Sequence, residues 1–504
     1  MKKSGVFAIS AVMLLASCTA ASATIDQKGA NVFPSSAIED SISITMGDVM
    51  PFYDDGVMNI YHLRNVTGSN SLFYHPIARL TTSDYIHYDN KGIALNYEEK
   101  ISSIDAALGT GSFIKAPDGT YHCFYTGHND KAGDSDLQGA GLIHKEAIRH
   151  ATSTDGQNTW TKDEEFLIWG YEDDFRDPYV YFDAQDNKYY MLVTSRDYGK
   201  AVIRRFSAAS LSAKSDEWEF VDNFFTNDEG DYNMECPSFI ELNGYYYLAY
   251  SEQGDNRVTH YRYKTTKDGE WKKFDRDAID AAGFYAGRLE KAGDKLFAFA
   301  WCARLTGGNT GAFDWAGNLV THELKQKENG ELCPVMPSTY KDYFNHPIEY
   351  LDGDGKKATS FEFSGEKFQG TSLGKLSENV TRVSMKVTPK GDEGDFGISF
   401  GLNNQYNNRL GDGLIAFDLS NNRIVCHNNV SSIVRYGPEL TSVAYDFEQD
   451  KEYTVDAVID DEIVSVYVND EIALTSRLIN MEGNSFAFYS NKAKADIKEV
   501  LFYE

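Results

Sequence analysis

Residues 243–250 read NGYYYLAY, an Asn-Gly pair followed at once by a run of aromatic and aliphatic residues. Asn-Gly and Asp-Gly readily take the positive-φ positions of a tight turn, and aromatic residues pack well on a pleated sheet, so this stretch predicts a turn and the strand that leaves it. The same order of turn signal and strand-like run returns in residues 54–63, 118–125, 186–193 and 293–301. These hairpins recur at intervals of roughly 50 to 70 residues, which indicates a repeated β unit.

Further strand pairs lie between several of these hairpins, as in residues 149–160 and 261–271, where a short run leads through Asp-Gly to a Trp. Four strands in each of about five units predict a five-bladed β-propeller over residues 41–340. Over residues 345–504 apolar and polar residues alternate more strictly, as in 453–459, which is typical of a sandwich whose sheets each have one solvated face. The predicted fold class is therefore all-β, a five-bladed β-propeller followed by a C-terminal β-sandwich.

The first residues resemble an export signal. Two lysines precede an apolar run over residues 6–16 that is short for a membrane span, and a Leu-Ala-Ser-Cys sequence ending at Cys18 has the form of a lipobox. We predict a signal peptide over 1–23, with Cys18 as the lipid-carrying residue, and a tether over 24–40. The alternative is ordinary cleavage after the Ala-Ser-Ala of residues 21–23. Both interpretations predict an exported protein in the periplasm or at the cell surface, and only the first adds a lipid anchor as its contact with a membrane.

The overall composition narrows the choice of partners. The chain carries 76 Asp and Glu against 48 Lys and Arg, a formal net charge of −28, and such a surface repels the phosphates of a nucleic acid. Tyr and Phe number 32 and 30, and their rings suit both strand packing and stacking against the C–H faces of sugars. The cysteines beyond residue 18 are widely spaced without a Cys-x-x-Cys pair, and the acidic loops lack calcium-loop spacing. We therefore predict a carbohydrate partner, no nucleic acid, no metal site and no cofactor.

Three acidic residues, Asp48, Asp177 and Glu235, each stand shortly before a proline and the start of a strand-like run. In a propeller the innermost strand of each blade faces a central funnel, so that side chains far apart in sequence can meet there. Cleavage of a glycosidic bond needs one group that protonates the leaving oxygen and a second that attacks the anomeric carbon or activates water. Carboxyl groups suit both roles, and clustered carboxylates raise the pKa of at least one member. This pattern predicts a glycoside hydrolase with these three catalytic acids.

Arg-Asp-Pro at 176–178 and Glu-Cys-Pro at 235–237 follow an early aspartate. These motifs resemble glycoside hydrolase family 32, which holds invertases, inulinases and levanases. Residues 315–324, WAGNLVTHEL, and 78–88, ARLTTSDYIHY, resemble further segments of that family, so the likeness covers nearly the whole mature chain. The resemblance implies a propeller with a following sandwich, and a hydrolase that cleaves fructosidic bonds in fructans or sucrose-type oligosaccharides with retention of configuration.

The resemblance also implies a role for each acid. Asp48 would be the nucleophile that forms a fructosyl ester, and Glu235 would protonate the leaving oxygen and then activate water. Asp177 would hold fructose hydroxyls and stabilise the oxocarbenium-like transition state, and Arg176 would place a fixed positive charge beside the acids. Nucleophile and acid are then expected about 5–5.5 Å apart.

The chain departs from the family's pattern around the sugar. The usual opening WMNDPNG is TMGDVMP at 45–51, so that Gly47 replaces the Asn before the aspartate. WSGS becomes GTGS at 109–112, the Gln late in the first hairpin becomes Asn65, and Phe-Tyr-Ala-Pro becomes Phe-Tyr-Ala-Gly at 284–287. The residues predicted to bind substrate are Arg176, Asn65, Thr110, Tyr285 and Trp301.

Other functions remain open at this level. Family 43 arabinanases and xylosidases also use two Asp and a Glu on five blades, which keeps an arabinan- or xylan-directed glycosidase as an alternative. The altered surroundings of Asp48 also fit a surface glycan-binding lipoprotein without activity. A third alternative is transfer of the fructosyl group to a sugar instead of water. Linkage, exo or endo cleavage, oligomeric state and membrane leaflet are not specified by the sequence.

Overall fold

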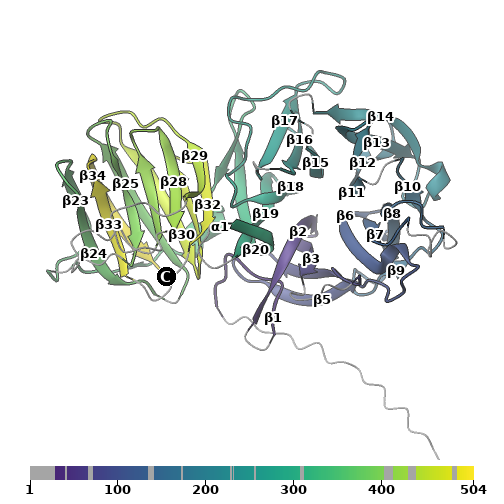
Figure 1. The fold of residues 1–504 in the computed structure, drawn as a ribbon, viewed down its shortest axis with the longest axis horizontal. Helices are drawn as coiled ribbons and strands as arrows, with labels where there is room; N and C mark the ends of the chain where they lie inside the picture. Colours follow the sequence, from purple (N-terminus) through teal and green to yellow (C-terminus); the bar gives the residue numbers. More distant parts are fainter. Residues whose placement is uncertain are drawn as a thin grey trace, which may run out of the picture.

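A computed structural model of the protein describes residues 29–504 apart from stretches at 40–41, 66–71, 134–140, 172–173, 228–229, 231, 255–256, 307–311, 353, 378, 402–412, 429–438 and 479–484. The predicted signal peptide over 1–23 and its Cys18 lie outside the described residues. Figure 1 shows a propeller and, beside it, a sandwich drawn in green to yellow. The predicted fold class, an all-β propeller followed by a β-sandwich, is confirmed.

The described part of the propeller forms five blades around a central axis, with β2, β6, β11, β15 and β18 innermost (Figure 1). Blade 1 contains β2 Ile42–Asp54, β3 Val57–Asn65, β4 Ile77–Thr82 and β5 Asp89–Leu95. Blade 2 contains β6 Ala107–Lys115, β7 Tyr121–His128, β8 Glu146–Ser153, β9 Thr161–Lys162 and β10 Ile168–Trp169. Blade 3 contains β11 Phe175–Asp183, β12 Lys188–Asp197, β13 Lys200–Ala208 and β14 Glu219–Thr226. Blade 4 contains β15 Met234–Leu242, β16 Tyr245–Glu252 and β17 Thr259–Lys264. Blade 5 contains β18 Tyr285–Ala292, β19 Lys295–Thr306, β20 Ala312–Gln326 and β21 Leu332–Val335.

Each of the five predicted turn-and-strand stretches contains the first turn of a blade. Between β15 and β16, for example, Asn243 and Gly244 have φ values of 49° and 80°, the positive-φ pair that the Asn-Gly signal predicts. Asp55 and Gly56 do the same between β2 and β3. The local turn chemistry therefore fixes where each innermost strand ends and its partner begins.

Blade 4 differs from the predicted four-stranded unit. Beyond β17, the described chain touches this blade through isolated bridges, between His260 and Ala278 and between Tyr263 and Lys272. The segment 265–280 is rich in Lys and Asp and lacks a period-two apolar pattern, so it gains little by joining a half-buried sheet.

Blade 1 and blade 5 close the ring. Met46 of β2 pairs with Gly317 of β20, so that strands from both ends of the propeller form one sheet. A Cβ atom at Gly317 would lie 1.7 Å from the carbonyl oxygen of Cys302 on β19. The close approach of these two strands therefore requires glycine at this position.

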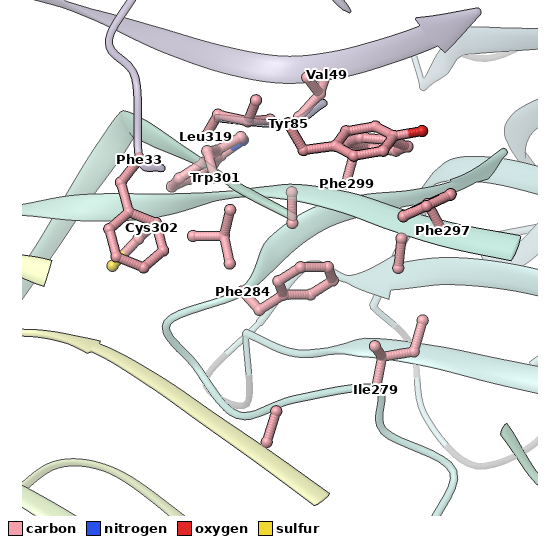
Figure 2. Close-up of a cluster of buried hydrophobic side chains, with 14 of the residues drawn as sticks. Phe33, Val49, Tyr85, Ile279, Phe284, Phe297, Phe299, Trp301, Cys302 and Leu319 are labelled. Carbon is pink, nitrogen blue, oxygen red and sulfur yellow. The ribbon is translucent and has the colours of Figure 1, made fainter. Parts of the chain in front are cut away.

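The segment predicted as a tether over 24–40 packs against the propeller in its described part, and this corrects the prediction. Val32 and Phe33 are buried, and Phe33 joins the hydrophobic cluster that contains Cys302 and Leu319 (Figure 2). The Phe33 and Pro34 carbonyls accept hydrogen bonds from blade 5, and β1 Ala37–Glu39 pairs with β2. Burial of two apolar side chains outweighs the flexible composition that suggested a tether.

The sandwich follows the short helix α1 Ser338–Tyr343. Its larger sheet contains β22 Pro347–Ile348, β23 Phe361–Ser364, β25 Thr381–Pro389, β30 Tyr453–Asp460, β31 Ile463–Val468, β32 Ile472–Arg477 and β34 Lys494–Tyr503. Its other sheet contains β24 Gln369–Lys375, β26 Asp395–Phe400, β27 Gly413–Asp418, β28 Arg423–Asn428, β29 Glu439–Ala444 and β33 Ser485–Asn491. Single 3₁₀ turns occur at Ile104–Ala106 and Ser215–Glu217.

A buried polar network joins the propeller to the sandwich. Fully buried His322 of β20 contacts Asp280 Oδ2 at 2.9 Å through Nε2 and the Tyr467 hydroxyl of the sandwich at 3.0 Å through Nδ1. Arg477 of β32 donates to the Ala303 carbonyl at 2.9 Å and to Asn318 Oδ1 at 2.5 Å, both on blade 5. The two domains therefore share satisfied buried polar groups as well as an apolar core.

The cysteines among the described residues form no disulfide. All of them are buried free thiols, namely Cys123, Cys236, Cys302, Cys333 and Cys426. Among the described residues, no helix has both the length and the apolar character needed to cross a membrane.

Candidate active site

All five innermost strands have a register irregularity. The shifts lie between Gly47 and Met50, Gly109 and Gly111, Arg176 and Tyr179, Glu235 and Ser238, and Tyr285 and Arg288. A bulge adds a residue to one strand and redirects its side chain. Residues at these irregularities that line a common cavity are Asp48, Thr110, Asp177, Glu235 and Tyr285.

The backbone at four of these bulges is strained. Asp48, Asp177, Cys236 and Ala286 have φ values of 32°, 59°, 54° and 56°, in the left-handed region that side chains other than glycine avoid. Such conformations cost on the order of 1–3 kcal/mol each and persist where the surrounding structure enforces them. The ring of strained bulges therefore marks this end of the propeller as a functional site.

The cavity has a volume of about 500 Å³. Its lining residues are Asp48, Leu63, Tyr74, His75, Leu108, Gly109, Thr110, Thr126, His128, Glu146, Asp174, Arg176, Asp177, Glu235, Gln253, Arg257, Tyr285 and Trp315. A pocket of this size, with apolar surface and a few converging polar groups, is suited to a small ligand such as one or two sugar units.

Asp48 has two hydrogen-bond donors. Trp301 Nε1 donates to Asp48 Oδ1 at 3.1 Å, and Thr110 Oγ1 donates to Oδ2 at 2.9 Å. Burial and the charge of Glu235 raise the pKa of Asp48, whereas these two hydrogen bonds and the charge of Arg288 lower it. On balance the pKa of Asp48 is raised, because burial and the charge of Glu235 outweigh the two hydrogen bonds and the charge of Arg288. The two donors hold the carboxylate in one orientation and limit this rise.

Glu235 is held by a cation and a phenol. Arg176 Nη2 donates to Oε1 at 2.9 Å, and the Tyr285 hydroxyl donates to Oε2 at 2.6 Å. Both oxygens are therefore fixed, and the side chain retains 17% of its exposure at the cavity wall. A carboxyl group in this position can exchange a proton with a ligand in the cavity.

The charges of both other acids act on Asp177. Its pKa is raised to about 7 because burial disfavours the charged form, and the charges of Glu235 and Asp48 add to this effect against Arg176. The Cys236 backbone N–H donates to Asp177 Oδ2 at 2.9 Å, and the Asp177 N–H donates to Thr126 Oγ1 at 2.9 Å. The acids of this cluster whose pKa is raised are therefore Asp48 and Asp177.

Arg176 is anchored by two further acids. Arg176 Nη1 donates to Asp174 Oδ1 at 2.7 Å and to Glu146 Oε2 at 3.3 Å. Glu146 also accepts the Phe175 N–H at 2.9 Å and faces His128 Nδ1 at 3.5 Å. The other side of the guanidinium is thereby directed at Glu235.

The residues predicted to bind substrate divide into three groups. Arg176, Thr110 and Tyr285 line the cavity. Trp301 is fully buried behind Asp48 and reaches that acid with its indole N–H. Asn65 lies outside the lining, because its amide donates to Thr45 Oγ1 at 3.1 Å near the end of β3, and this corrects its predicted place in the site.

Some lining residues were not predicted from the sequence. Tyr74 and His75 lie in the loop before β4, and Glu146 begins β8, where an acid is ordinarily solvated. Trp315 begins the strand-like segment 315–324, but the residues around it carry no signal for a cavity. Their positions depend on contacts between blades, which the sequence pattern does not display.

Within the part of the chain that the structure describes, no three His, Cys, Asp or Glu side chains are grouped so that they could hold a metal ion. The chemistry available in the cavity is that of carboxyl groups held by hydrogen-bond donors.

Comparison with protein families gives matches over both domains. The model for the glycosyl hydrolases family 32 N-terminal domain matches residues 50–332, and the model for the family 32 C terminal matches residues 349–504. The first match covers more than half of the chain and begins two residues after Asp48.

One curated relative and several solved structures are similar to the chain. A sucrose-6-phosphate hydrolase of Staphylococcus xylosus is 34% identical over 87 residues, which span 17% of this chain and 16% of that relative. The chain thus spans about a sixth of the length of the curated relative that it matches.

The exo-inulinase of Aspergillus awamori has a TM-score of 0.68 at 15% identity, covering 90% of this chain and 96% of the other. The sucrose-6-phosphate hydrolase of Lactobacillus gasseri has a TM-score of 0.65 at 17% identity, covering 92% and 91%. A mutant Bombyx mori β-fructofuranosidase in complex with sucrose has a TM-score of 0.65 at 17% identity, covering 91% and 92%. At these identities the likeness concerns the fold.

Proposed function

Because this chain belongs to glycosyl hydrolase family 32, we propose that it hydrolyses fructosidic bonds in fructans or sucrose-type oligosaccharides, with retention of configuration. The observation that carries this proposal is the meeting of Asp48, Asp177 and Glu235, from three different blades, in one cavity. The relatives named above support fructosides as the substrate class.

In the first step an oxygen of Asp48 forms an ester bond to the anomeric carbon C2 of the fructosyl unit. The bond from C2 to the leaving oxygen breaks, and Glu235 gives its proton to that oxygen. Arg176, which donates to Glu235 Oε1, and Tyr285, which donates to Oε2, keep the carboxyl group in place for this transfer.

In the second step the Glu235 carboxylate takes a proton from water, the water oxygen bonds to C2, and the ester bond to Asp48 breaks. Asp177 holds sugar hydroxyls, and its raised pKa near 7 lets it donate as well as accept hydrogen bonds around neutral pH. A sugar hydroxyl in place of water would give fructosyl transfer by the same steps.

The test compares the purified wild-type protein with Asp48→Ala and Glu235→Ala on sucrose, inulin, levan, sucrose 6-phosphate and arabinan. We expect release of fructose by the wild type and losses of between about 10² and about 10⁴ in kcat for Glu235→Ala. The loss for Asp48→Ala should be at least as large, because the ester cannot form.

A matched control is Glu241→Gln, which changes an exposed acid at the other end of β15 and should leave kcat unchanged. Unchanged turnover in both alanine variants would contradict the proposal. Arabinose release without fructose would point to an arabinan-directed enzyme, and sugar binding without hydrolysis would point to a glycan-binding protein.

Export is a separate part of the proposal. The basic start, the apolar run over residues 6–16 and the lipobox-like sequence support a lipid-anchored protein attached through Cys18. A Cys18→Ser variant should lose incorporation of a labelled fatty acid and leave the membrane fraction. Labelling that persists in this variant would contradict a lipid anchor at Cys18.

A further inference from the structure

A second cavity lies at the end of the propeller opposite to the catalytic acids. It is lined by residues of blades 3 and 4 and has a volume of about 420 Å³, comparable to that of the catalytic cavity. Asp177 stands near the start of β11, whereas Asp183 at the end of that strand lines the second cavity. At about 3.3 Å per residue these two positions are roughly 20 Å apart. Neither step of the proposed reaction uses this cavity.

Aromatic rings from both blades line the second cavity. Tyr179 and Tyr181 are two residues apart on β11 and therefore lie on one face of blade 3. Phe239 of β15 and Tyr246 of β16 have ring centroids 6.0 Å apart and an interplanar angle of 11°. Tyr181 and Phe239 meet between the blades at 4.8 Å, and the Tyr179 hydroxyl donates to the Phe239 carbonyl at 3.2 Å. All four residues are only half-buried, so this cavity offers aromatic surface to a ligand.

Charged groups beside these rings compensate one another. Lys267, in the loop after β17, reaches across to blade 3, where its Nζ lies 2.7 Å from Asp183 Oδ2 and 2.7 Å from Asp186 Oδ2. The exposed amide of Gln185 also lines the cavity. An anionic ligand would meet two carboxylates, and a cationic ligand would find both of them already paired with a lysine. The polar part of the cavity therefore suits a neutral ligand that forms hydrogen bonds.

We propose that the second cavity is a non-catalytic carbohydrate-binding site, which holds one or two neutral sugar units of a polymeric substrate. The identity of that polymer as a fructan rests on the proposed function. Sugars have C–H faces that pack on aromatic rings and hydroxyls that pair with amide and carboxylate groups, and the cavity offers both. A polymer held here raises the concentration of its other segments around the enzyme, so the site favours long substrates over sucrose.

The binding test is isothermal titration calorimetry of a short inulin oligosaccharide with Glu235→Gln, a variant in which turnover is slowed. We expect two binding sites on each molecule of this variant. Adding Tyr246→Ala should weaken one of them about tenfold, because one ring of the second cavity is lost, whereas Tyr246→Phe keeps the ring and should retain both. A single site in Glu235→Gln, or two unweakened sites after Tyr246→Ala, would overturn the inference.

Tyr245→Ala is the matched control. Tyr245 precedes Tyr246 on β16, is half-buried as well, and contacts Tyr247 and Tyr263 on the other face of the blade. It lines neither of the two cavities, so both sites should remain. Ala184→Arg covers the case in which Tyr246→Ala does not fold. Ala184 is an exposed lining residue in the turn after β11, so a long side chain there should obstruct the cavity, and undiminished binding at the second site would overturn the inference.

Turnover gives an independent readout. Tyr246→Ala in the otherwise wild-type protein should lower the ratio of kcat/KM on inulin to kcat/KM on sucrose about fivefold, through KM for inulin. A ratio equal to that of the wild type would overturn the role in holding polymer. Two-site binding without any hydrolysis by the wild type would support the second site and contradict the proposed function. Hydrolysis with one-site binding would do the reverse, so the two failures are distinguishable.

Discussion

Buried charge dominates the chemistry of individual residues in the cavity. Asp177 is buried and Asp48 is half-buried at the cavity wall, and burial raises the pKa of each before the neighbouring acids add their effect. The hydrogen bonds from Trp301 and Thr110 work in the opposite direction on Asp48. An enzyme built on these acids thus depends on donors that stabilise one carboxylate while another holds a proton.

The first prediction concerns stability and pH. The pKa of Asp177 is about 7 in the folded chain and near 3.8 in an unfolded one, so between these values the folded state holds a proton that the unfolded state has lost. Stability therefore falls as pH rises through this window, at up to about 1.4 kcal/mol per pH unit. Asp177→Asn removes this titration, so its melting temperature should decline less than that of the wild type between about pH 4 and about pH 7. Parallel melting curves for the two proteins would contradict the burial of this acid.

The second prediction concerns Glu146, which positions Arg176. Burial opposes its charge, but the hydrogen bond from His128 and the charge of Arg176 outweigh burial and lower its pKa. Glu146→Gln should reduce kcat by between about tenfold and about 100-fold, because Arg176 loses one of the anions that direct it at Glu235. The pH profile of kcat should shift as well, which a purely structural loss would not produce.

Asp130→Asn is the control for Glu146. It also contacts His128, at 3.0 Å, but has no contact with Arg176. We expect kcat within about threefold of the wild type for this control. Equal losses in both variants would show that Glu146 acts through the stability of the loop and not through Arg176.

The three acids could be predicted from the sequence because each precedes a proline and a strand start in a repeated pattern. Glu146, Tyr74 and His75 could not, since a loop or a strand start places them and their partners lie on other blades. The prediction that Asn65 binds substrate was wrong for a similar reason. Its amide donates a hydrogen bond to a threonine on the neighbouring strand, which the sequence pattern does not show.

At the scale of secondary-structure elements, the β-bulges direct the side chains of the site into the cavity. Each innermost strand gains an extra residue at the level of the cavity and pairs regularly with its neighbour beyond that point. Turn signals and aromatic runs, which are local, made all five first hairpins predictable. The bulges were not predictable, because they depend on how neighbouring blades crowd around the axis.

The third prediction tests one bulge. A Cβ atom at Gly111 would lie 2.3 Å from the Phe124 carbonyl oxygen and 2.9 Å from the Tyr125 Cα, and backbone atoms cannot move aside cheaply. Gly111→Ala should destabilise the fold by about 1–3 kcal/mol and lower kcat, because Thr110 next to it holds Asp48.

Gly391→Ala serves as its control in denaturant unfolding. Its nearest heavy atom to the added Cβ is at 4.0 Å, so the change should be close to neutral. A normal unfolding midpoint and normal kcat in Gly111→Ala would show that the bulge tolerates a side chain and does not constrain Thr110.

At the scale of the whole molecule, the two domains form one structural unit. The hydrophobic cluster around Trp301 and Phe284 (Figure 2) also includes Tyr467 and Ala473 of the sandwich. The N-terminal segment also contributes to this interface between the propeller and the sandwich, which we call the joint, because the Val32 N–H donates to Asp460 Oδ2 at 3.0 Å. The sequence predicted both domains but not this joint, since none of its contacts is local in sequence.

The fourth prediction concerns this joint. Arg477→Ala removes a buried donor to the carbonyls of Ala303 and Cys302, and the unfolding free energy should fall by about 3 kcal/mol. Arg423→Ala, which breaks ion pairs within the sandwich, should cost less than about 1 kcal/mol. Equal costs in chemical denaturation would contradict a role of Arg477 in the joint.

The central claim is that Asp48 receives a fructosyl group while Glu235 moves the proton, and the most direct test is to capture that ester. The wild-type protein is quenched in acid during turnover of a fructoside and is then digested. The masses of its peptides are measured by mass spectrometry. The predicted result is one hexosyl unit on the peptide that contains Asp48, absent from the Asp48→Asn variant. Turnover with no adduct on that peptide, or an adduct on Asp177 or Glu235 instead, would contradict the account.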